Sequence, residues 1–429
     1  MTVPLSLTGK YQVVILGQES DPRVTECASR LRIALNLAFS QLGVSFNKFL
    51  VELLPWAAGI DLDRRMPTVA VFFGFSPSPS ISTRDANRLA TLLTEGVLII
   101  PVVENITSFH SMVPPEISHL NGCSLAECGA DLERLASRVL EGFGLLREKR
   151  RLFISYRRIE TSGVAAQLYE ALDAAGFDVF LDTHGVLRPG EPFQEILWHR
   201  LADTDVAVLL DSPGFLASRW TEEELARANT SNIQLLQMLW PGQTEGGTAA
   251  FSTFHPLAET DFAGTEIVGA AALLKDDRVG ALVDEVEGLR ARAFGARHAF
   301  LVGEFAKEAR KEGLQVVTTL ERTLVLSTPK GNRVLVMPTI GIPDAERYET
   351  LERLHQRDVG LGRTYAQPPV LLYDQTGIRS RWLQHLGWLN ENIAAARSIM
   401  FCAIVFLSKV PPAFRGGCGM LLEEGFWPG

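Results

Sequence analysis

Three apolar runs in the middle of the chain each lead into residues that could bind or act on a ligand. The first run ends in Ser155-Tyr156-Arg157-Arg158 and the second ends in Asp182, while the third is followed by a polar segment from Ser212 to Glu224. Ligands of an open parallel sheet bind outside the carboxyl ends of its strands. We therefore expect these guanidinium, aromatic and carboxylate groups to share one edge of a sheet.

The elements that would position these residues alternate between strand-like and helix-like patterns. Short runs rich in Val, Ile, Leu and Phe are typical of strands buried on both faces of a parallel sheet. Between them, apolar residues recur every three or four positions, as in amphipathic helices. The runs are residues 13–16, 69–73, 97–103, 152–155, 179–181 and 206–210. The pattern predicts an α/β chain, doubly wound and repeated.

Two changes of pattern divide the chain into three expected domains, with bounds 1–146, 149–294 and 296–429. A charged segment, Arg147 to Arg151, precedes a fresh strand, and a helical stretch from Val279 to Ala293 precedes the second boundary. In the last third, the runs 323–327 and 333–337 flank Pro-Lys-Gly-Asn, which predicts a β-hairpin. We expect an α+β domain there, for sensing or assembly. It shows no nuclease-type D…E-x-K, P-loop or Ser/His/Asp order.

Five short motifs of the middle region occur in a characteristic order. They are FISYRR (153–158), GFDVFLD (176–182), RPG (188–190), SP (212–213) and SRWTEEEL (218–225). This order resembles a bacterial TIR (Toll/interleukin-1 receptor) domain over about residues 149–290, which implies a flavodoxin-like fold. Two positions depart from the usual pattern: Thr221 stands where many members have Cys, and Ile159 stands where an acid often follows the arginines.

The resemblance implies an enzyme that cleaves the nicotinamide-ribosyl bond of NAD, with Glu224 of the W-x-x-x-E motif as the catalytic acid. The leaving group is neutral, so one carboxylate that faces the positive charge developing on the ribose suffices. NAD is then the substrate, and no other cofactor and no metal is expected. Residues expected to bind NAD are Phe153, Ser155, Tyr156, Arg157, Asp182, Ser218 and Trp220.

Other interpretations of the same residues stay open. Thr221 and Glu224 fit a helix capping box, in which the glutamate reaches back to the backbone of the threonine. With that role for Glu224, the region is a non-enzymatic TIR adaptor that acts as a docking face. A third possibility is a TIR enzyme that makes a cyclic ADP-ribose-type messenger for a separate effector.

The first 145 residues resemble the middle region at a constant offset of 136 residues. The run that begins at Thr68 matches the one at Thr204, and Ser76-Pro77 matches Ser212-Pro213. At this offset the partner of Glu224 is Arg88, so this copy would lack the catalytic acid. We expect a degenerate TIR-like or flavodoxin-like domain for assembly or sensing, although strand-helix-strand units also resemble one another by chance.

Composition bounds the class of protein. The chain has 429 residues, 46% of them hydrophobic, and a formal net charge of -9 from 41 basic and 50 acidic residues. A large core is expected, and nucleic acid is an unlikely partner. The five scattered cysteines indicate neither a disulfide framework nor a zinc site.

No signal peptide or membrane span is visible, so we expect a cytoplasmic protein. The resemblance implies antiviral defence, with activation by self-association, a partner protein or a ligand.

Overall fold

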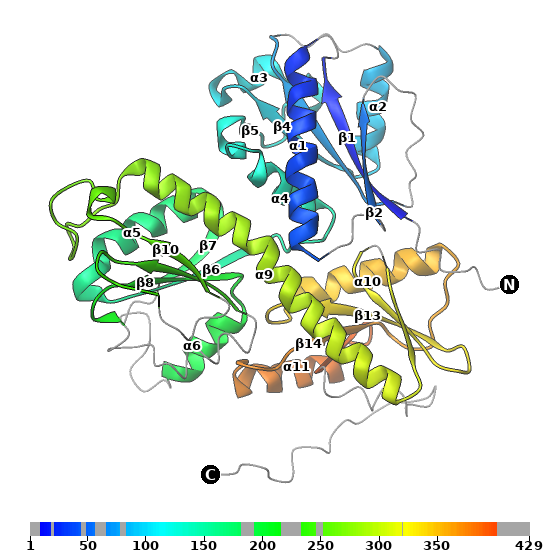
Figure 1. Ribbon diagram of the computed structural model, residues 1–429. Helices are drawn as coiled ribbons and strands as arrows, with labels where there is room; N and C mark the ends of the chain where they lie inside the picture. The colour runs from blue at the N-terminus through cyan, green and yellow to red at the C-terminus, as the bar shows by residue number, and fades with distance from the viewer. Residues whose placement is uncertain are drawn as a thin grey trace, which may run out of the picture. The chain divides into compact units, whose positions relative to one another are not determined.

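The computed structural model describes residues 9–18, 21–43, 49–55, 66–77, 83–181, 193–215, 233–245, 252–319 and 321–400. These residues form two compact units (Figure 1). One unit takes the described residues up to 181 together with those from 205 to 296. The other takes those from 193 to 204 and from 297 onward.

The first unit begins with a five-stranded parallel sheet in the order β2-β1-β3-β4-β5. Its strands are β1 (Gly9–Gly17), β2 (Phe49–Pro55), β3 (Thr68–Gly74), β4 (Leu98–Val103) and β5 (Cys123–Ser124). The connecting helices are α1 (Pro22–Gln41), α2 (Thr83–Thr94), α3 (Phe109–Met112) and α4 (Glu133–Gly142), with 3-10 turns η1 (Ile106–Ser108), η2 (Pro115–Ile117) and η3 (Ala126–Cys128). The expected parallel α/β architecture of this region is confirmed.

Local sequence explains where α1 begins and which face it buries. The Asp21 side chain accepts a hydrogen bond from the Arg23 backbone N–H, and Pro22 occupies the first helical position, where its missing N–H is not needed. The buried residues recur at the spacing of one helix face; they are Val24, Cys27, Leu31, Ala34, Leu35, Ala38 and Phe39. Phe39 packs on Tyr11 of β1, with ring centroids 5.3 Å apart.

A second parallel sheet of the same unit has the order β10-β9-β8-β6-β7. Its strands are β6 (Arg150–Tyr156), β7 (Phe177–Leu181), β8 (Val206–Asp211), β9 (Gln234–Leu239) and β10 (Ser252–Pro256). The helices α5 (Arg158–Ala174) and α9 (Asp276–Lys311) and the turn η4 (Glu259–Asp261) follow them. When the strands of each sheet are numbered in chain order, both parallel sheets have the order 2-1-3-4-5, which is that of flavodoxin-like folds.

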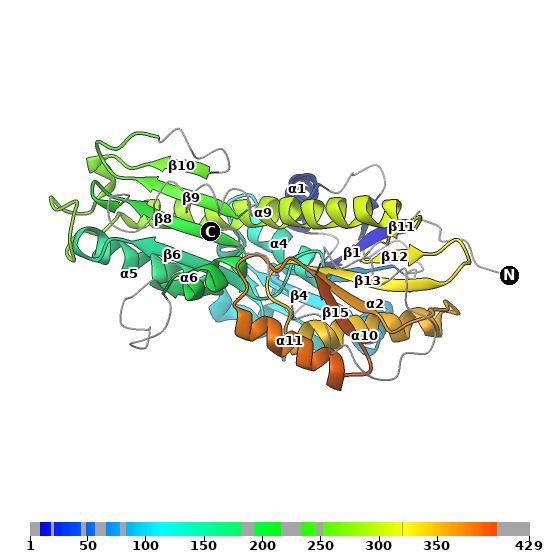
Figure 2. The ribbon, with the colours of Figure 1, turned by 90° about the horizontal axis from the view of Figure 1, so that it is seen from below.

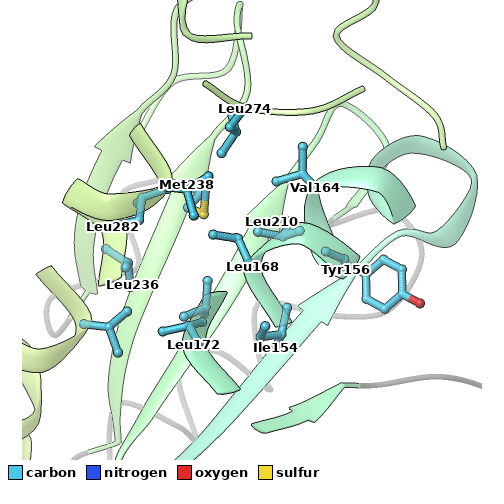
Figure 3. Packing of buried hydrophobic residues seen from close by; sticks show 14 of the residues in the cluster. Ile154, Tyr156, Val164, Leu168, Leu172, Leu210, Leu236, Met238, Leu274 and Leu282 are labelled. Carbon is cyan, nitrogen blue, oxygen red and sulfur yellow. The ribbon is translucent and has the colours of Figure 1, made fainter. Parts of the chain in front are cut away.

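One face of the second sheet carries a continuous apolar core (Figure 3). Ile154, Leu210 and Leu236 of the sheet pack with Leu168 of α5 and Leu282 of α9, and all five are at most 2% exposed. Apolar residues on alternate positions of three neighbouring strands thus meet two amphipathic helices. This burial supplies much of the free energy that holds the sheet and its helices together.

The offset of 136 residues aligns strands of the two parallel sheets. Subtracting 136 from the bounds of β9, Gln234–Leu239, gives Leu98–Val103, the bounds of β4. The same subtraction places β8 on residues 70–75, which overlap β3 (68–74) over five residues. The comparison of Arg88 with Glu224 lies outside the described residues, so the loss of a catalytic acid in the first copy stays a prediction.

The second unit is built on a mixed sheet in the order β11-β12-β13-β14-β15. Its elements are α6 (Phe193–Ala202), β11 (Gln315–Thr318), β12 (Leu324–Ser327), β13 (Arg333–Thr339), α10 (Ala345–Gly360), β14 (Val370–Tyr373), α11 (Ser380–Asn392) and β15 (Arg397–Met400). Strand β12 is antiparallel to β13, as the hairpin prediction requires, and β14 and β15 add in parallel. Figure 2 shows α10 and α11 on one side of this sheet and the end of α9 on the other.

Helix α9 differs from the sequence-based expectation, which placed a break near residue 295. The helix runs unbroken from Asp276 to Lys311. Gly295 lies inside it, where a Cβ atom would come within 2.7 Å of the backbone of Gln41 and Leu42. The glycine therefore permits close contact with the end of α1 and does not end the helix. No described helix is both long and apolar enough to cross a membrane.

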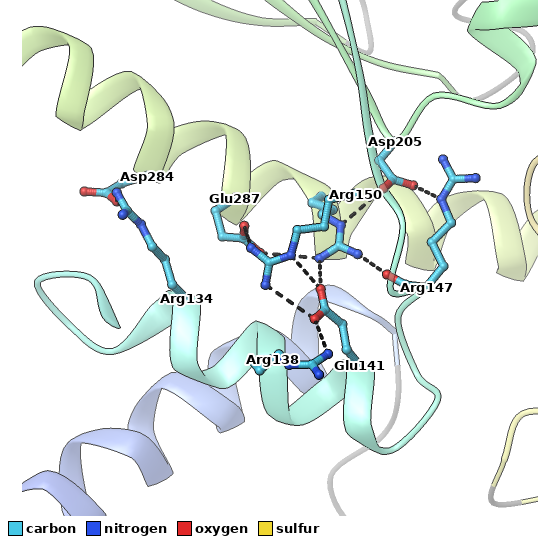
Figure 4. Close-up of polar contacts among 9 residues, drawn as sticks. Arg134, Arg138, Glu141, Arg147, Arg150, Asp205, Asp284 and Glu287 are labelled. Atoms are coloured by element: carbon cyan, nitrogen blue, oxygen red, sulfur yellow. Dashed lines mark hydrogen bonds and ion pairs between the residues drawn. The ribbon is translucent and has the colours of Figure 1, made fainter. Parts of the chain in front are cut away.

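A buried ionic cluster joins α4, α9 and the start of β6 and β8 (Figure 4). Arg290, 1% exposed, places its Nη1 2.6 Å from Glu141 Oε1 and its Nε 3.2 Å from Asp205 Oδ2. Arg147 Nε lies 2.8 Å from the other Asp205 oxygen, and Arg150 Nε lies 2.8 Å from Glu141 Oε1. These five residues, with Glu287 and Arg138, are called the Arg290 cluster below. Glu287 lies 3.1 Å from Arg150, and Arg138 lies 3.1 Å from Glu141.

The cluster is stable only while its charges remain paired. Burial acts to raise the pKa of Glu141, but the charges of Arg290 and Arg150 outweigh it and hold that pKa below its ordinary value of 4.5. A carboxylate whose folded pKa is depressed adds stability above its unfolded pKa, and that stability is lost as the pH falls through the folded pKa. The cluster therefore ties the first sheet to the second most strongly at neutral pH.

We expect Arg290→Met to lower the free energy of unfolding by about 3–5 kcal/mol, because it leaves buried carboxylates without their central partner. Urea denaturation of the full chain at neutral pH measures the change. Arg292→Met is the matched control: Arg292 is exposed two residues further along α9, and its loss should cost no more than about 0.5 kcal/mol. Equal losses for both variants would contradict a special role for the cluster.

A second buried carboxyl, Asp211 at the end of β8, has a different environment. It is 3% exposed, and its Oδ2 accepts a hydrogen bond of 2.6 Å from Gln237 Nε2. Burial raises the pKa of Asp211, and the hydrogen bond from Gln237 only partly opposes the shift. Because the folded pKa is raised, the charged form is penalised, and this group lowers stability as the pH rises towards neutrality.

We expect Asp211→Asn to raise the free energy of unfolding at neutral pH by about 1 kcal/mol. The asparagine can still accept from Gln237, and its amide can donate to Gln237 Oε1, which is buried without a described hydrogen-bond partner. Thermal unfolding at mildly acidic and at neutral pH measures the effect, with the exposed Asp178→Asn as control. A loss of stability at both pH values would refute the assignment.

Candidate functional site

The candidate site is the carboxyl edge of the second sheet, between β6 and β8. From this point the chain continues to β7 on one side and to β9 on the other, so the order reverses here. Tyr156 of β6 is in register with Leu210 of β8, which brings Arg157 beside the turn that begins at Ser212. Such a reversal opens the crevice in which doubly wound sheets bind their ligands.

An ion pair occupies the described part of this edge. Arg157, the first residue after β6, pairs through Nη1 with the Oε1 atom of Glu160, three residues on. The second carboxylate oxygen of Glu160 accepts a hydrogen bond of 3.1 Å from the backbone N–H of Gly214. One glutamate thus connects the end of β6 with the turn after β8.

The ion pair packs closely against the backbone of Gly214. A Cβ atom there would overlap the Arg157 guanidinium and lie 2.7 Å from Glu160 Oε1. The backbone of Glu160 is held as well, because the N–H of Gly269 donates to its carbonyl over 2.6 Å. Helix α5 is locally irregular just after it, with φ -134° at Thr161. The start of α5 is therefore shaped around the ion pair.

The surroundings of the Glu160 carboxyl favour its ionised form. Its partial burial acts to raise its pKa, but Ser212, the Gly214 N–H and Arg157 together lower it below the ordinary value. The side chains of Arg157 and Glu160 remain 32% and 19% exposed. The pair can therefore present a positive charge to an anionic ligand while the carboxylate fixes where that charge lies.

The structure places the sequence-predicted site residues in two environments, as far as they are described. Phe153 and Ser155 are fully buried in β6, and Tyr156 is 5% exposed. Phe153 stacks on Phe180 of β7, with ring centroids 5.5 Å apart. Arg157 lies at the surface of the edge. Outside the described residues lie Asp182, Ser218, Trp220 and Glu224, so their assembly around Arg157 stays a prediction.

Glu160 is the residue that the motif analysis passed over. The family pattern drew attention to Ile159, where an acid is often found, and the side chain of Ile159 is 72% exposed. The carboxylate one residue later performs the pairing. The sequence could have indicated this pair, because Glu160 follows Arg157 by three residues, and that spacing places the two side chains on one face at the start of a helix.

The first sheet has a comparable ion pair at its own point of strand reversal, between β1 and β3. Arg23 Nη2 lies 2.7 Å from Asp21 Oδ2 and donates to the backbone carbonyl of Phe75 over 2.8 Å. Its Nη1 reaches Glu104, which follows β4, over 3.1 Å. The arginine of this sheet thus has two carboxylate partners, whereas Arg157 is described with one.

Within the described ranges, no group of three or more His, Cys, Asp or Glu side chains could hold a metal ion. The partly exposed guanidinium of Arg157 gives the described edge a donor for an anion. The N–H groups of the adjoining turn are already used, since that of Ser212 donates to the Leu210 carbonyl and that of Gly214 donates to Glu160. A phosphate or carboxylate ligand matches the guanidinium.

Comparison with known proteins identifies this region. The model of the TIR domain family matches residues 152–261, which begin within β6 and extend past β10. Among curated proteins no match is found. A solved structure described as a "putative phosphosugar isomerase" from Silicibacter pomeroyi DSS-3 is 10% identical, with a TM-score of 0.19, over 69% of this chain and 86% of that one. So low a TM-score supports no conclusion about fold or function. The strand order, the edge between β6 and β8 and the family match agree that this part of the chain, residues 152–261, is a TIR domain.

Proposed function

We propose that the TIR domain of this protein cleaves the nicotinamide-ribosyl bond of NAD. The observation that supports it most is the partly exposed Arg157, held by Glu160 at the strand reversal of a domain that matches the TIR family. NAD carries a pyrophosphate, and a guanidinium binds phosphate oxygens through paired hydrogen bonds. The proposed position of the pyrophosphate is therefore beside Arg157 and the Gly214 turn.

The proposed chemistry needs one carboxylate near the ribose. As the bond to nicotinamide stretches, positive charge develops on the ribose and the neutral nicotinamide leaves without needing a proton. Glu224 would stabilise that charge and hold the ribose hydroxyls. Trp220 would supply an apolar wall, and water or a second atom of the ligand would then attack the ribose carbon. The two acceptors lead to ADP-ribose or to a cyclic ADP-ribose-type messenger.

A non-enzymatic adaptor is the second candidate, and two observations favour it. Arg157 already has a carboxylate partner, and the aromatic rings of Phe153 and Tyr156 lie in the core, out of reach of a ligand. The exposed apolar side chain of Ile159, beside this pair, is suited to a protein contact. In that case Glu224 caps a helix, and the TIR surface docks onto another TIR domain or a partner protein.

The proposal also covers how the NAD-cleaving activity is switched on and which biological process it serves. TIR domains commonly associate with one another, and we propose that self-association, a partner protein or a small ligand activates this chain. A role in prokaryotic antiviral defence follows from the kind of protein it resembles. Depletion of NAD would then halt the infected cell before the virus multiplies.

Glu224→Ala is expected to abolish the loss of NAD, because no other carboxylate would face the developing charge. Liquid chromatography of NAD, nicotinamide and ADP-ribose species measures the activity, with full-length protein alone, with a crowding agent and with a co-expressed neighbour. Glu222→Ala is the control, since it removes the same charge two residues away. Intact NAD under every condition, together with a stable complex, would favour the adaptor.

Glu160→Gln is expected to raise KM for NAD about two- to fivefold and to leave kcat nearly unchanged. The glutamine can still accept from the Gly214 N–H, but it no longer fixes Arg157 by charge, and a partly exposed ion pair contributes up to about 1 kcal/mol. Steady-state kinetics separate the two constants. Glu170→Gln, exposed on the same helix, serves as control. A fall in kcat with unchanged KM would rule out this positioning role.

A further inference from the structure

Two cysteines that look unremarkable in the sequence lie against each other in the first sheet domain. The Sγ atoms of Cys123 and Cys128 are 3.4 Å apart. Cys123 belongs to the short edge strand β5, and Cys128 ends the 3-10 turn η3. Both are free thiols. A disulfide bond is about 2.05 Å long, so the sulfur atoms need to approach by only about 1.4 Å to form one.

The turn between the two cysteines is held in the conformation that keeps them together. The Ser124 N–H donates to Glu127 Oε2 over 2.6 Å, and the Glu127 N–H donates to Ser124 Oγ over 3.3 Å. The Leu125 N–H donates to the Val103 carbonyl of β4 over 2.7 Å, which fixes the turn on the sheet. The loop between the thiols therefore needs little rearrangement to close.

The two thiols have unequal chemistry. The hydrogen bond between the two thiols lowers the pKa of Cys123, although burial opposes this. The same contact together with burial raises the pKa of Cys128. Cys123 is partly exposed, whereas Cys128 is 2% exposed. A partly exposed cysteine whose pKa is lowered, in contact with a sheltered thiol, is the arrangement of a reactive cysteine with a resolving cysteine.

We propose that Cys123 and Cys128 form a reversible redox site, in which Cys123 reacts with a peroxide and Cys128 resolves the product to a disulfide. The Cys123 thiolate attacks one oxygen of hydrogen peroxide and becomes a sulfenic acid, releasing hydroxide. The Cys128 sulfur then displaces water from the sulfenic acid. In total, two thiols lose two electrons and two protons, and one peroxide becomes two waters.

The neighbouring cysteine provides an internal comparison. Cys27 of α1 is 3% exposed, and burial raises the pKa of its thiol. It is therefore expected to resist the same oxidant. The disulfide would join η3 to the edge strand directly ahead of Gly129 and α4, the helix that carries Glu141. Oxidation would thus tighten the segment that leads into the Arg290 cluster.

Mass spectrometry of the full-length protein tests the proposal. The reduced chain is exposed to hydrogen peroxide, alkylated with N-ethylmaleimide and digested with trypsin. Both cysteines fall in one peptide, 89–134, which contains no other cysteine and no internal lysine or arginine. The expected product is this peptide lighter by two hydrogens and free of label, returning to the doubly labelled form after dithiothreitol. The peptide with Cys27 should remain labelled throughout.

Two variants make the order of events testable. Cys128→Ser is expected to stop at a sulfenic acid on Cys123 that dimedone traps, and Cys123→Ser to leave Cys128 labelled by the maleimide after denaturation. Cys27→Ser, the matched control, should form the disulfide at the wild-type rate. Full labelling of both thiols in the oxidised wild-type protein, or a disulfide from Cys123 to Cys402 or Cys418, would overturn the proposal.

Discussion

The unit that holds both parallel sheets depends on the pairing of Arg290 with the carboxylates of Glu141 and Asp205. Glu141 comes from the last helix of the first sheet domain, and Asp205 directly precedes the central strand β8 of the second. A guanidinium that is 1% exposed must satisfy its donors within the protein, because an unpaired buried charge is very costly. Its partners are therefore confined to one geometry, and that geometry sets where α4 and α9 meet β8.

The pairing of Arg290 also affects the candidate site, because strand β8 connects the two. The Arg290 cluster lies at the amino end of the strand, and the Ser212–Gly214 turn follows its carboxyl end, six strand residues further on. Since a strand is stiff and hydrogen-bonded to β6 and β9 along its length, fixing one end in register also fixes the other. The contact between Gly214 and Arg157 is thus a consequence of sheet register as much as of the residues at the edge.

The sequence predicted features that depend on local pattern and on order along the chain. Apolar runs marked the central strands, the offset of 136 residues placed β4 on β9, and the Lys-Gly-Asn turn marked the hairpin of β12 and β13. It could not predict features that depend on which distant side chains meet. The helical stretch was expected to end before the boundary near residue 295, because the close contact of Gly295 with Gln41 cannot be read from the sequence. Likewise, Cys123 and Cys128 meet only because a turn folds back on β5.

The two domains with the same strand order differ in what surrounds the arginine at the strand reversal. Arg23 has Asp21 and Glu104 as partners, so a bound anion there would have to approach two carboxylates. The described carboxylate partner of Arg157 is Glu160 alone. The Glu160 carboxylate also accepts a hydrogen bond from the Gly214 N–H, so its negative charge is shared between Arg157 and this N–H. An anion is therefore opposed less strongly at Arg157 than at Arg23. Among the described residues, the second sheet is therefore the better place for a phosphate-bearing ligand.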